Sequence, residues 1–200
     1  MINIMRKYIT FISVLIFLFV NHLADPSALI ADEVDSLLQV VDRQENSAEK
    51  VDNLNKLAYD FRSINTDTAI YFADQALTLA RALEYKKGIA NANYMKCIAY
   101  RRSGDYNSAR ETAEAALSLA REIGDSVIIT KSLYNLGMIY STKGESGLAI
   151  ANYREALEAY RQEKKKFQMM AVCNAMGQLF NTIALYDSAA IYLNLALELS

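Results

Sequence analysis

The pattern of apolar residues repeats every forty positions over most of the chain. One column holds alanine in every unit: Ala69, Ala109, Ala149 and Ala189. A second alanine column follows at the same interval: Ala76, Ala116, Ala156 and Ala196. A third column is aromatic: Phe61, Tyr100, Tyr140 and Phe180. A fourth holds small residues: Cys97, Gly137 and Gly177, with Ala58 one position out of register. Self-similarity at a fixed period predicts stacked units that each bury an apolar face against a neighbour.

Turn and capping residues divide each unit into two predicted helices. Asn46 or Ser47 suits the N-cap of the first helix, and Asn65-Thr66-Asp67 predicts the turn that follows it. Later turns are predicted at Ser103-Gly104-Asp105 and Lys143-Gly144. Gly124 followed by Asp125 indicates a helix end and a new N-cap. The sequence therefore predicts an all-α chain of paired helices.

These residues resemble the tetratricopeptide-repeat (TPR) family. In the third unit, Leu133, Leu136, Gly137 and Tyr140 match the L-G-x₂-Y part of the family pattern, and Ala149, Tyr153 and Ala156 match its second helix. The second unit departs most, with Asn93, Lys96 and Cys97 at the first-helix positions. The usual proline is absent at Arg121 and Arg161, which together with the forty-residue period indicates long helices. The resemblance covers about residues 48–200.

The resemblance implies an α-α superhelix (solenoid) of antiparallel helix pairs, with about four repeats. Their expected ranges are 47–86, 87–125, 126–165 and 166–200. Residues 32–46 are predicted to form an N-terminal capping helix, because Val34, Leu37, Leu38 and Val41 have i, i+3, i+4, i+7 spacing. Ser200 falls one residue before the end of the unit. This indicates either a chain cut from a longer protein, the interpretation we favour, or a last helix that pairs with another molecule.

The N-terminus has the pattern of a secretory signal. Arg6-Lys7 precedes thirteen uncharged residues, Tyr8 to Val20. As a helix this run would span about 20 Å, less than the roughly 30 Å of a bilayer's hydrocarbon core. We therefore predict a signal peptide over residues 1–31 in preference to a permanent anchor. Ala24 and Ala31 are both candidate cleavage positions.

The composition argues against catalysis and against nucleic-acid binding in this segment. The net charge is −2, and the only histidine, His22, lies in the predicted signal peptide. Cys97 and Cys173 lack metal-site spacing and fall in apolar helical patterns. The Lys164-Lys165-Lys166 run is interpreted as a solvated turn instead of a binding patch. We expect no catalytic residue, cofactor or metal, and no enzymatic activity in the residues shown.

The remaining candidate is a partner-binding groove. The resemblance implies that the first helix of each repeat lines a concave face. The predicted groove residues are Asn55, Tyr59, Arg62, Tyr94, Ile98, Arg101, Arg102, Lys131, Tyr134, Met138, Asn174, Gln178 and Asn181. Tyrosine beside arginine and asparagine is typical of protein-binding surfaces. Only Asp52 offsets the cations on this face, so the expected partner is a protein or peptide that carries carboxylates.

Three functions are compatible with these features. The leading hypothesis is an exported protein- or peptide-binding module, periplasmic or membrane-associated, that resembles the sensory N-terminal part of bacterial signalling proteins. The second is the docking region of an enzyme, such as a histidine kinase, whose catalytic domain lies beyond residue 200. The third is a free-standing exported scaffold. Membrane attachment is expected only through a retained N-terminal segment or a downstream helix.

Overall fold

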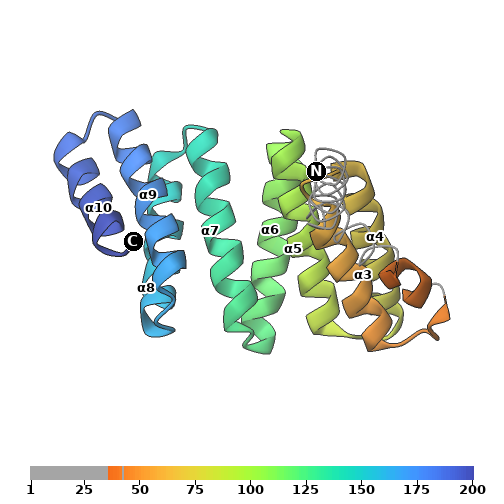
Figure 1. Cartoon of the computed structure of the whole chain (residues 1–200). Coiled ribbons are helices and arrows are strands. Elements are labelled where there is room, and N and C mark those ends of the chain that lie inside the picture. Colours follow the sequence, from red (N-terminus) through yellow and green to blue (C-terminus); the bar gives the residue numbers. More distant parts are fainter. Residues whose placement is uncertain (1–35, 42) are drawn as a thin grey trace, which may run out of the picture. The chain divides into compact units, whose positions relative to one another are not determined.

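A computed structural model of the chain describes residues 36–41 and 43–200 (Figure 1). They belong to two compact units, one ending at Arg43 and the other spanning Gln44–Ser200. In the first unit residues 36–41 are helical, inside the predicted capping helix, whereas residues 44–46 are not helical. The predicted signal peptide lies outside the described residues. None of the helices in the described residues is long and apolar enough to span a membrane.

The unit Gln44–Ser200 consists of antiparallel helix pairs. The first helices of the pairs are α3 (Ala48–Phe61), α5 (Lys86–Ser103), α7 (Ser126–Thr142) and α9 (Lys166–Thr182). The second helices are α4 (Thr66–Ala82), α6 (Tyr106–Ile123), α8 (Ser146–Gln162) and α10 (Tyr186–Glu198). No strand occurs in the residues that the structure describes. The prediction of an all-α superhelix with about four repeats is confirmed.

The pairs stack so that the first helices form one layer and the second helices another. Among the first helices, α5 packs against both α3 and α7, and α7 packs against α9. Within Gln44–Ser200, no second helix packs against another second helix. Because the first helices touch one another and the second helices do not, the layer of first helices is shorter along the stack than the layer of second helices. The stack therefore curves with the first helices on its concave side.

Every turn from α4–α5 to α9–α10 shares one backbone geometry, which the α3–α4 turn lacks. A residue with positive φ occurs every twenty positions: Glu84, Gly104, Gly124, Gly144, Lys164 and Ala184. In the α7–α8 turn, the Gly144 N–H donates to the Ser141 carbonyl (3.1 Å) and the Glu145 N–H donates to the Tyr140 carbonyl (2.9 Å). These bonds satisfy carbonyls left open at the helix end. The helix ends predicted at Gly104, Gly124 and Gly144 are confirmed. The helix ends at residues 84, 164 and 184 have no glycine from which they could be predicted.

Side-chain caps begin several of the helices. Ser47 accepts a hydrogen bond from the Lys50 N–H, and Asn65 accepts one from the Thr68 N–H. Asp105 and Asp125 accept in the same way from the N–H groups of Ser108 and Ile128. Each bond satisfies one of the amide groups that a helix start leaves without an intrahelical partner. The N-cap at Asp125 and that of α3 are confirmed, with Ser47 rather than Asn46 opening α3, and Asn65 and Asp105 cap the helices that follow their predicted turns.

The small-residue column marks the closest approach of the two helices in a pair. A Cβ atom at Gly137 would lie 2.5 Å from the ring of Tyr153, and one at Gly177 would lie 2.6 Å from Leu193. Tyr153 and Leu193 occupy the same position in α8 and α10. In the second repeat, which carries the larger Cys97 in the small-residue column, this position holds Ala113. The two columns therefore compensate in size, and the expectation of a close helix contact at Gly137 is confirmed.

We predict that Gly137→Ala destabilises the protein, although alanine is normally the better helix former. The new methyl group overlaps the Tyr153 ring, which is itself buried at 2% exposure. Overpacking of this kind costs about 1–3 kcal/mol in the free energy of unfolding, measured by urea denaturation.

The control is Gly147→Ala, because no atom lies within 4 Å of a Cβ atom built there. It should be neutral or stabilising by up to about 1 kcal/mol. In a Tyr153→Ala background, Gly137→Ala should lose its cost. An equal cost with and without the Tyr153 ring would contradict this packing.

We also predict that Ala184→Gly stabilises the protein by roughly 0.5–1 kcal/mol. Ala184 is exposed and has φ 58°, a conformation that costs a residue with a Cβ atom about 1 kcal/mol or more. The greater entropy of glycine in the unfolded chain offsets part of the gain. The matched control, Gly144→Ala in the equivalent turn, should lower the unfolding free energy by a similar amount. A loss of stability in Ala184→Gly would refute the turn geometry.

Candidate functional site

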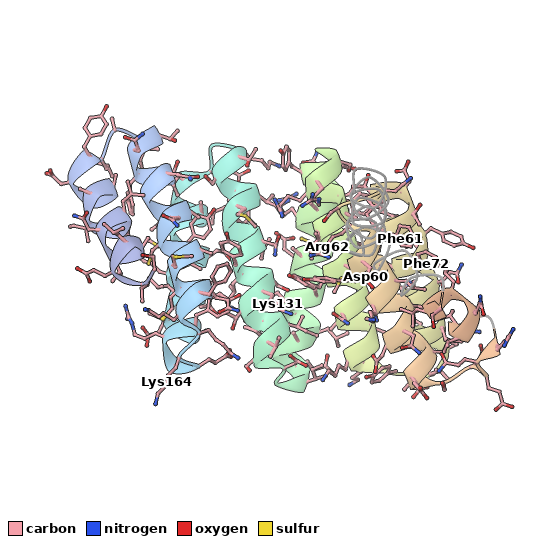
Figure 2. All side chains as sticks on the ribbon, viewed as in Figure 1. Asp60, Phe61, Arg62, Phe72, Lys131 and Lys164 are labelled. Carbon is pink, nitrogen blue, oxygen red and sulfur yellow. The ribbon has the colours of Figure 1, made fainter. Side chains whose placement is uncertain are left out.

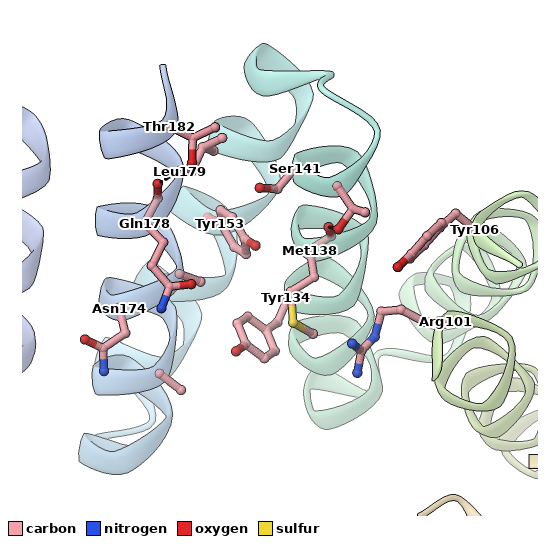
Figure 3. A pocket seen from close by; sticks show the side chains of 13 residues that line it. Arg101, Tyr106, Tyr134, Met138, Ser141, Tyr153, Asn174, Gln178, Leu179 and Thr182 are labelled. Carbon is pink, nitrogen blue, oxygen red and sulfur yellow. Dashed lines mark hydrogen bonds between the residues drawn. The ribbon is translucent and has the colours of Figure 1, made fainter. Parts of the chain in front are cut away.

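A groove of about 500 Å³ opens on the concave side, where α5, α7 and α9 succeed one another (Figure 3). Figure 3 shows Arg101 and Tyr106 on one side of α7, and Asn174 and Gln178 on the other. The lining residues are Arg101, Tyr106, Tyr134, Met138, Ser141, Thr142, Tyr153, Ala171, Asn174, Ala175, Gln178, Leu179 and Thr182. Most come from α7 and α9, so the groove belongs mainly to the third and fourth repeats.

Arg101 is the one charged residue among the described residues that line this groove. Its Nε donates to Asn135 Oδ1 at 3.0 Å, and Asn135 Nδ2 donates to the Lys131 carbonyl at 2.9 Å. Asn135 is buried, with 4% of its surface exposed, so its position is fixed by packing as well as by these bonds. The Arg101 guanidinium is therefore oriented before any ligand arrives, and it uses one of its five N–H groups for that purpose.

Two tyrosine rings form the floor of the groove beside Arg101. The ring centroids of Tyr134 and Tyr153 lie 6.0 Å apart, with their planes tilted by 47°. Burial raises the pKa of Tyr134, and the nearby Arg101 charge partly opposes that shift. Burial also raises the pKa of Tyr153 well above its usual value, against the opposing effects of Arg101 and of a hydrogen bond with Ser141. Both phenols are protonated at neutral pH, and the partly exposed Tyr134 offers a hydroxyl group at the edge of an apolar ring, whereas Tyr153 is buried.

The far side of the groove is polar and uncharged. Asn174 and Gln178 lie one turn apart on α9, and both are exposed. Thr182 follows one turn later and donates its hydroxyl hydrogen to the Gln178 carbonyl at 2.9 Å. Each of the two amide side chains can donate and accept, which suits the paired N–H and C=O groups of a peptide backbone. The groove thus has a cationic end and an amide end.

The structure brings five of the predicted groove residues into this groove: Arg101, Tyr134, Met138, Asn174 and Gln178. Lys131, Asn181 and Tyr59 are exposed outside it, the last with 43% of its surface accessible. Tyr94 and Ile98 are each 7% exposed, so they contribute mainly to packing. Lys131 Nζ lies 5.8 Å from the centre of the Tyr94 ring, within reach of a cation–π contact.

The structure corrects the prediction made for Asn55. It was predicted to face a partner, but only 1% of its surface is exposed and its Nδ2 donates to the Gly88 carbonyl at 3.4 Å. Gly88 belongs to α5, so Asn55 joins the first helices of two successive repeats. The reason is its place in the stack: the equivalent position in the second repeat is Tyr94, which is also buried. Asn55 is therefore packed inside the protein and is not presented to a ligand, although its Oδ1 has no hydrogen-bond partner there.

Arg62 and Arg102 are a second correction. They were expected to surround the same tyrosines as Arg101, but they line a separate depression of about 400 Å³. It lies at the carboxyl ends of α3 and α5 and includes the α3–α4 turn. The predicted cations are therefore divided between two places. Arg101 is held toward α7 by Asn135, whereas Arg62 stacks on Tyr59 of its own helix.

Sequence reasoning missed eight of the lining residues: Tyr106, Ser141, Thr142, Tyr153, Ala171, Ala175, Leu179 and Thr182. Tyr106 and Tyr153 come from second helices, whereas the resemblance placed only first helices in the groove. The sequence did contain a signal for Tyr153. The glycine at position 137 leaves a gap in the first helix, and a large residue at the matching position of the second helix can reach through that gap. Ser141 also occupies the column of Arg101, forty residues later.

The described residues contain no cluster of metal-ligating side chains. Both cysteines in this part of the chain are buried. Burial raises the pKa of the Cys97 thiol to about 12, so it is protonated at neutral pH. A thiol in that state is a packing residue instead of a nucleophile.

Comparison with known families decides the class of this fold. Residues 88–162 match the family model described as tetratricopeptide repeat. Residues 88–162 are therefore tetratricopeptide repeats. The match spans α5 to α8, which form the second and third repeats and include Arg101 and Tyr134. No curated protein is a significant sequence match.

Solved structures share the TPR fold at low sequence identity. BtubC (BKLC) from P. vanneervenii is 21% identical with a TM-score of 0.71, covering 86% of this chain and 71% of that one. A Rap protein complexed with Competence and Sporulation Factor is 16% identical with a TM-score of 0.67, covering 85% of this chain and 58% of that one.

A third similar structure is a signal transduction ATPase with numerous domains from Pyrococcus horikoshii, described as having a tetratricopeptide repeat sensor. It is 18% identical with a TM-score of 0.74, covering 86% of this chain and 27% of that one. This chain thus spans less than two thirds of the Rap protein and about a quarter of the ATPase. At these identities the similarity establishes the fold alone.

Proposed function

We propose that the groove binds an extended or helical segment of another protein, or a peptide, with a carboxylate placed on Arg101. The observation that carries this proposal is the arginine itself. Its guanidinium is half-buried, it is oriented by the buried Asn135, and no carboxylate is among the residues that line the groove. An oriented cation without an acidic neighbour in the groove favours a ligand that supplies the acid.

The chemistry around Arg101 fits that ligand. A guanidinium presents parallel N–H groups that match the two oxygens of a carboxylate. The neighbouring Tyr134 ring supplies rigid apolar area at little cost in side-chain entropy, and its hydroxyl can bond to a ligand backbone. The buried Tyr153 ring supports it from behind. Charge at Arg101 then sets the specificity, while the aromatic floor supplies affinity that does not depend on salt.

The amide end of the groove suits the backbone of the bound segment. Asn174 and Gln178 carry no charge, and α9 places both on the groove side (Figure 3). In this proposal they hold the part of the ligand that follows its acidic residue. The Rap protein in complex with Competence and Sporulation Factor offers a fold-level parallel for ligand binding by such an array.

We further propose that the module is exported and serves as the sensory part of a longer, membrane-associated signalling protein. The charged start and the apolar run Tyr8 to Val20 support export. The tetratricopeptide repeat sensor of the Pyrococcus horikoshii ATPase supports a sensory role by analogy of fold.

Binding is tested by capture from the native exported fraction, followed by titration of the captured partner. Arg101→Glu should weaken binding at least tenfold at low salt and flatten the dependence on salt, because the Debye length falls from about 10 Å at 0.1 M to about 3 Å at 1 M. Tyr134→Ala should weaken binding at every salt concentration.

Arg154→Glu is the matched control, since Arg154 is exposed on α8 and does not line the groove. It makes the same change of charge and should leave affinity within about twofold. A partner that binds Arg101→Glu and Tyr134→Ala as tightly as the parent protein would show that this groove is not its site.

Export is tested on the mature N-terminus. N-terminal sequencing of the protein from a cell fraction outside the cytoplasm should find a start between Asp25 and Asp32. Ile16→Arg, which places a charge in the middle of the apolar run, should leave the precursor in the cytosol. Recovery of the unmodified protein in the cytosol with Met1 or Ile2 retained would disprove the export proposal.

A further inference from the structure

A second site is indicated by the depression at the carboxyl ends of α3 and α5. It has a volume of about 400 Å³ and is lined by Arg62, Ser63, Ile64, Asn65, Thr66 and Arg102. Two of these six side chains are guanidinium groups, and three others carry a hydroxyl or an amide. None is a carboxylate. The nearest acidic residues in sequence to Arg62, Asp60 and Asp67, are not among the lining residues.

Arg62 is held in place by its own helix. Arg62 is labelled in Figure 2. Its guanidinium carbon lies 3.3 Å from the centre of the Tyr59 ring, and its Nη1 donates to the Tyr59 carbonyl. Stacking of this kind fixes the plane of the guanidinium and leaves its other N–H groups to be used elsewhere. The entropy cost of ordering this long side chain has therefore been met before a ligand binds.

Arg102 approaches the same depression from α5 and is exposed. Two like charges that share a depression of this size repel each other, and an anion between them removes that repulsion. Asn65 Oδ1 accepts from the Thr68 N–H at 3.0 Å, which leaves the amide nitrogen of Asn65 as a donor. The hydroxyls of Ser63 and Thr66 add further donors. The depression therefore presents an excess of hydrogen-bond donors over acceptors, together with two positive charges.

We propose that this depression binds an oxyanion, either a phosphate or a carboxylate group. A phosphate group fits best, because its charge of about −1.5 to −2 at neutral pH balances two guanidinium groups and its oxygens can bond to both. The site does not rest on the function proposed for the groove. It lies on the first repeat and the end of α5, and it shares no lining residue with the groove.

The test is titration of the full chain with inorganic phosphate, and separately with acetate, at constant ionic strength set by sodium chloride. Backbone amide chemical shifts in an NMR spectrum report the site of binding. The amides of residues 63–66 should shift with a saturable dependence on phosphate. Arg62→Gln and Arg102→Gln should each weaken phosphate binding about tenfold, as expected for loss of one charged hydrogen-bonding group.

Arg154→Gln is the control, because it removes the same charge from an exposed position on α8. It should keep the parent affinity for phosphate. Saturable shifts with phosphate alone would identify a phosphate site, and shifts with both anions would identify a general oxyanion site. Shifts that do not saturate, or that Arg102→Gln and Arg154→Gln reduce equally, would refute the proposal. Arg102 is exposed, so its variant should fold whatever happens to Arg62→Gln.

Discussion

The close approach of the two helices within each pair is the constraint on which the rest of the structure depends. It requires a residue without a large side chain in the first helix and one that fills the resulting space from the second. The repeats meet this requirement in different ways. The third pairs Gly137 with Tyr153, the fourth pairs Gly177 with Leu193, and the second pairs Cys97 with Ala113. Because only the combined size matters, neither column needs to be constant. The Gly137 pairing also sends Tyr153 through to the concave side, where its ring becomes part of the groove.

The recurring turn geometry arranges these local contacts into a regular array. From residue 84 onward, a positive-φ residue every twenty positions gives the turns a common geometry, so helix pairs recur in one register. Side chains that occupy the same column of the repeat then face the same side of the stack. Curvature follows, because first helices touch one another and second helices do not. The concave face is thus a consequence of packing, and its chemistry can vary from repeat to repeat without changing the fold.

That freedom is visible in one column of the first helices. It holds Arg62, Arg101, Ser141 and Asn181 in successive repeats. The cations lie in the first two repeats, and polar uncharged residues follow in the last two. Arg101 is steered into the groove by Asn135, whereas Arg62 is drawn onto the Tyr59 ring. The same residue type in the same column therefore serves two different surfaces.

The sequence by itself determined the class of fold, the repeat register and most helix boundaries, because these depend on local signals: periodic apolar residues, N-caps and glycine turns. It could not reveal the turns at Glu84, Lys164 and Ala184, where tertiary packing imposes a backbone that the residue does not favour. It also named Arg101, Tyr134, Met138, Asn174 and Gln178 for the groove, since they face inward from first helices. Only the tertiary structure decided that Asn55 is buried and that Arg62 and Arg102 lie apart from Arg101. Those outcomes depend on which neighbour each side chain meets. Gly88 and Asn135, more than thirty positions away, meet Asn55 and Arg101, whereas Arg62 turns back onto Tyr59.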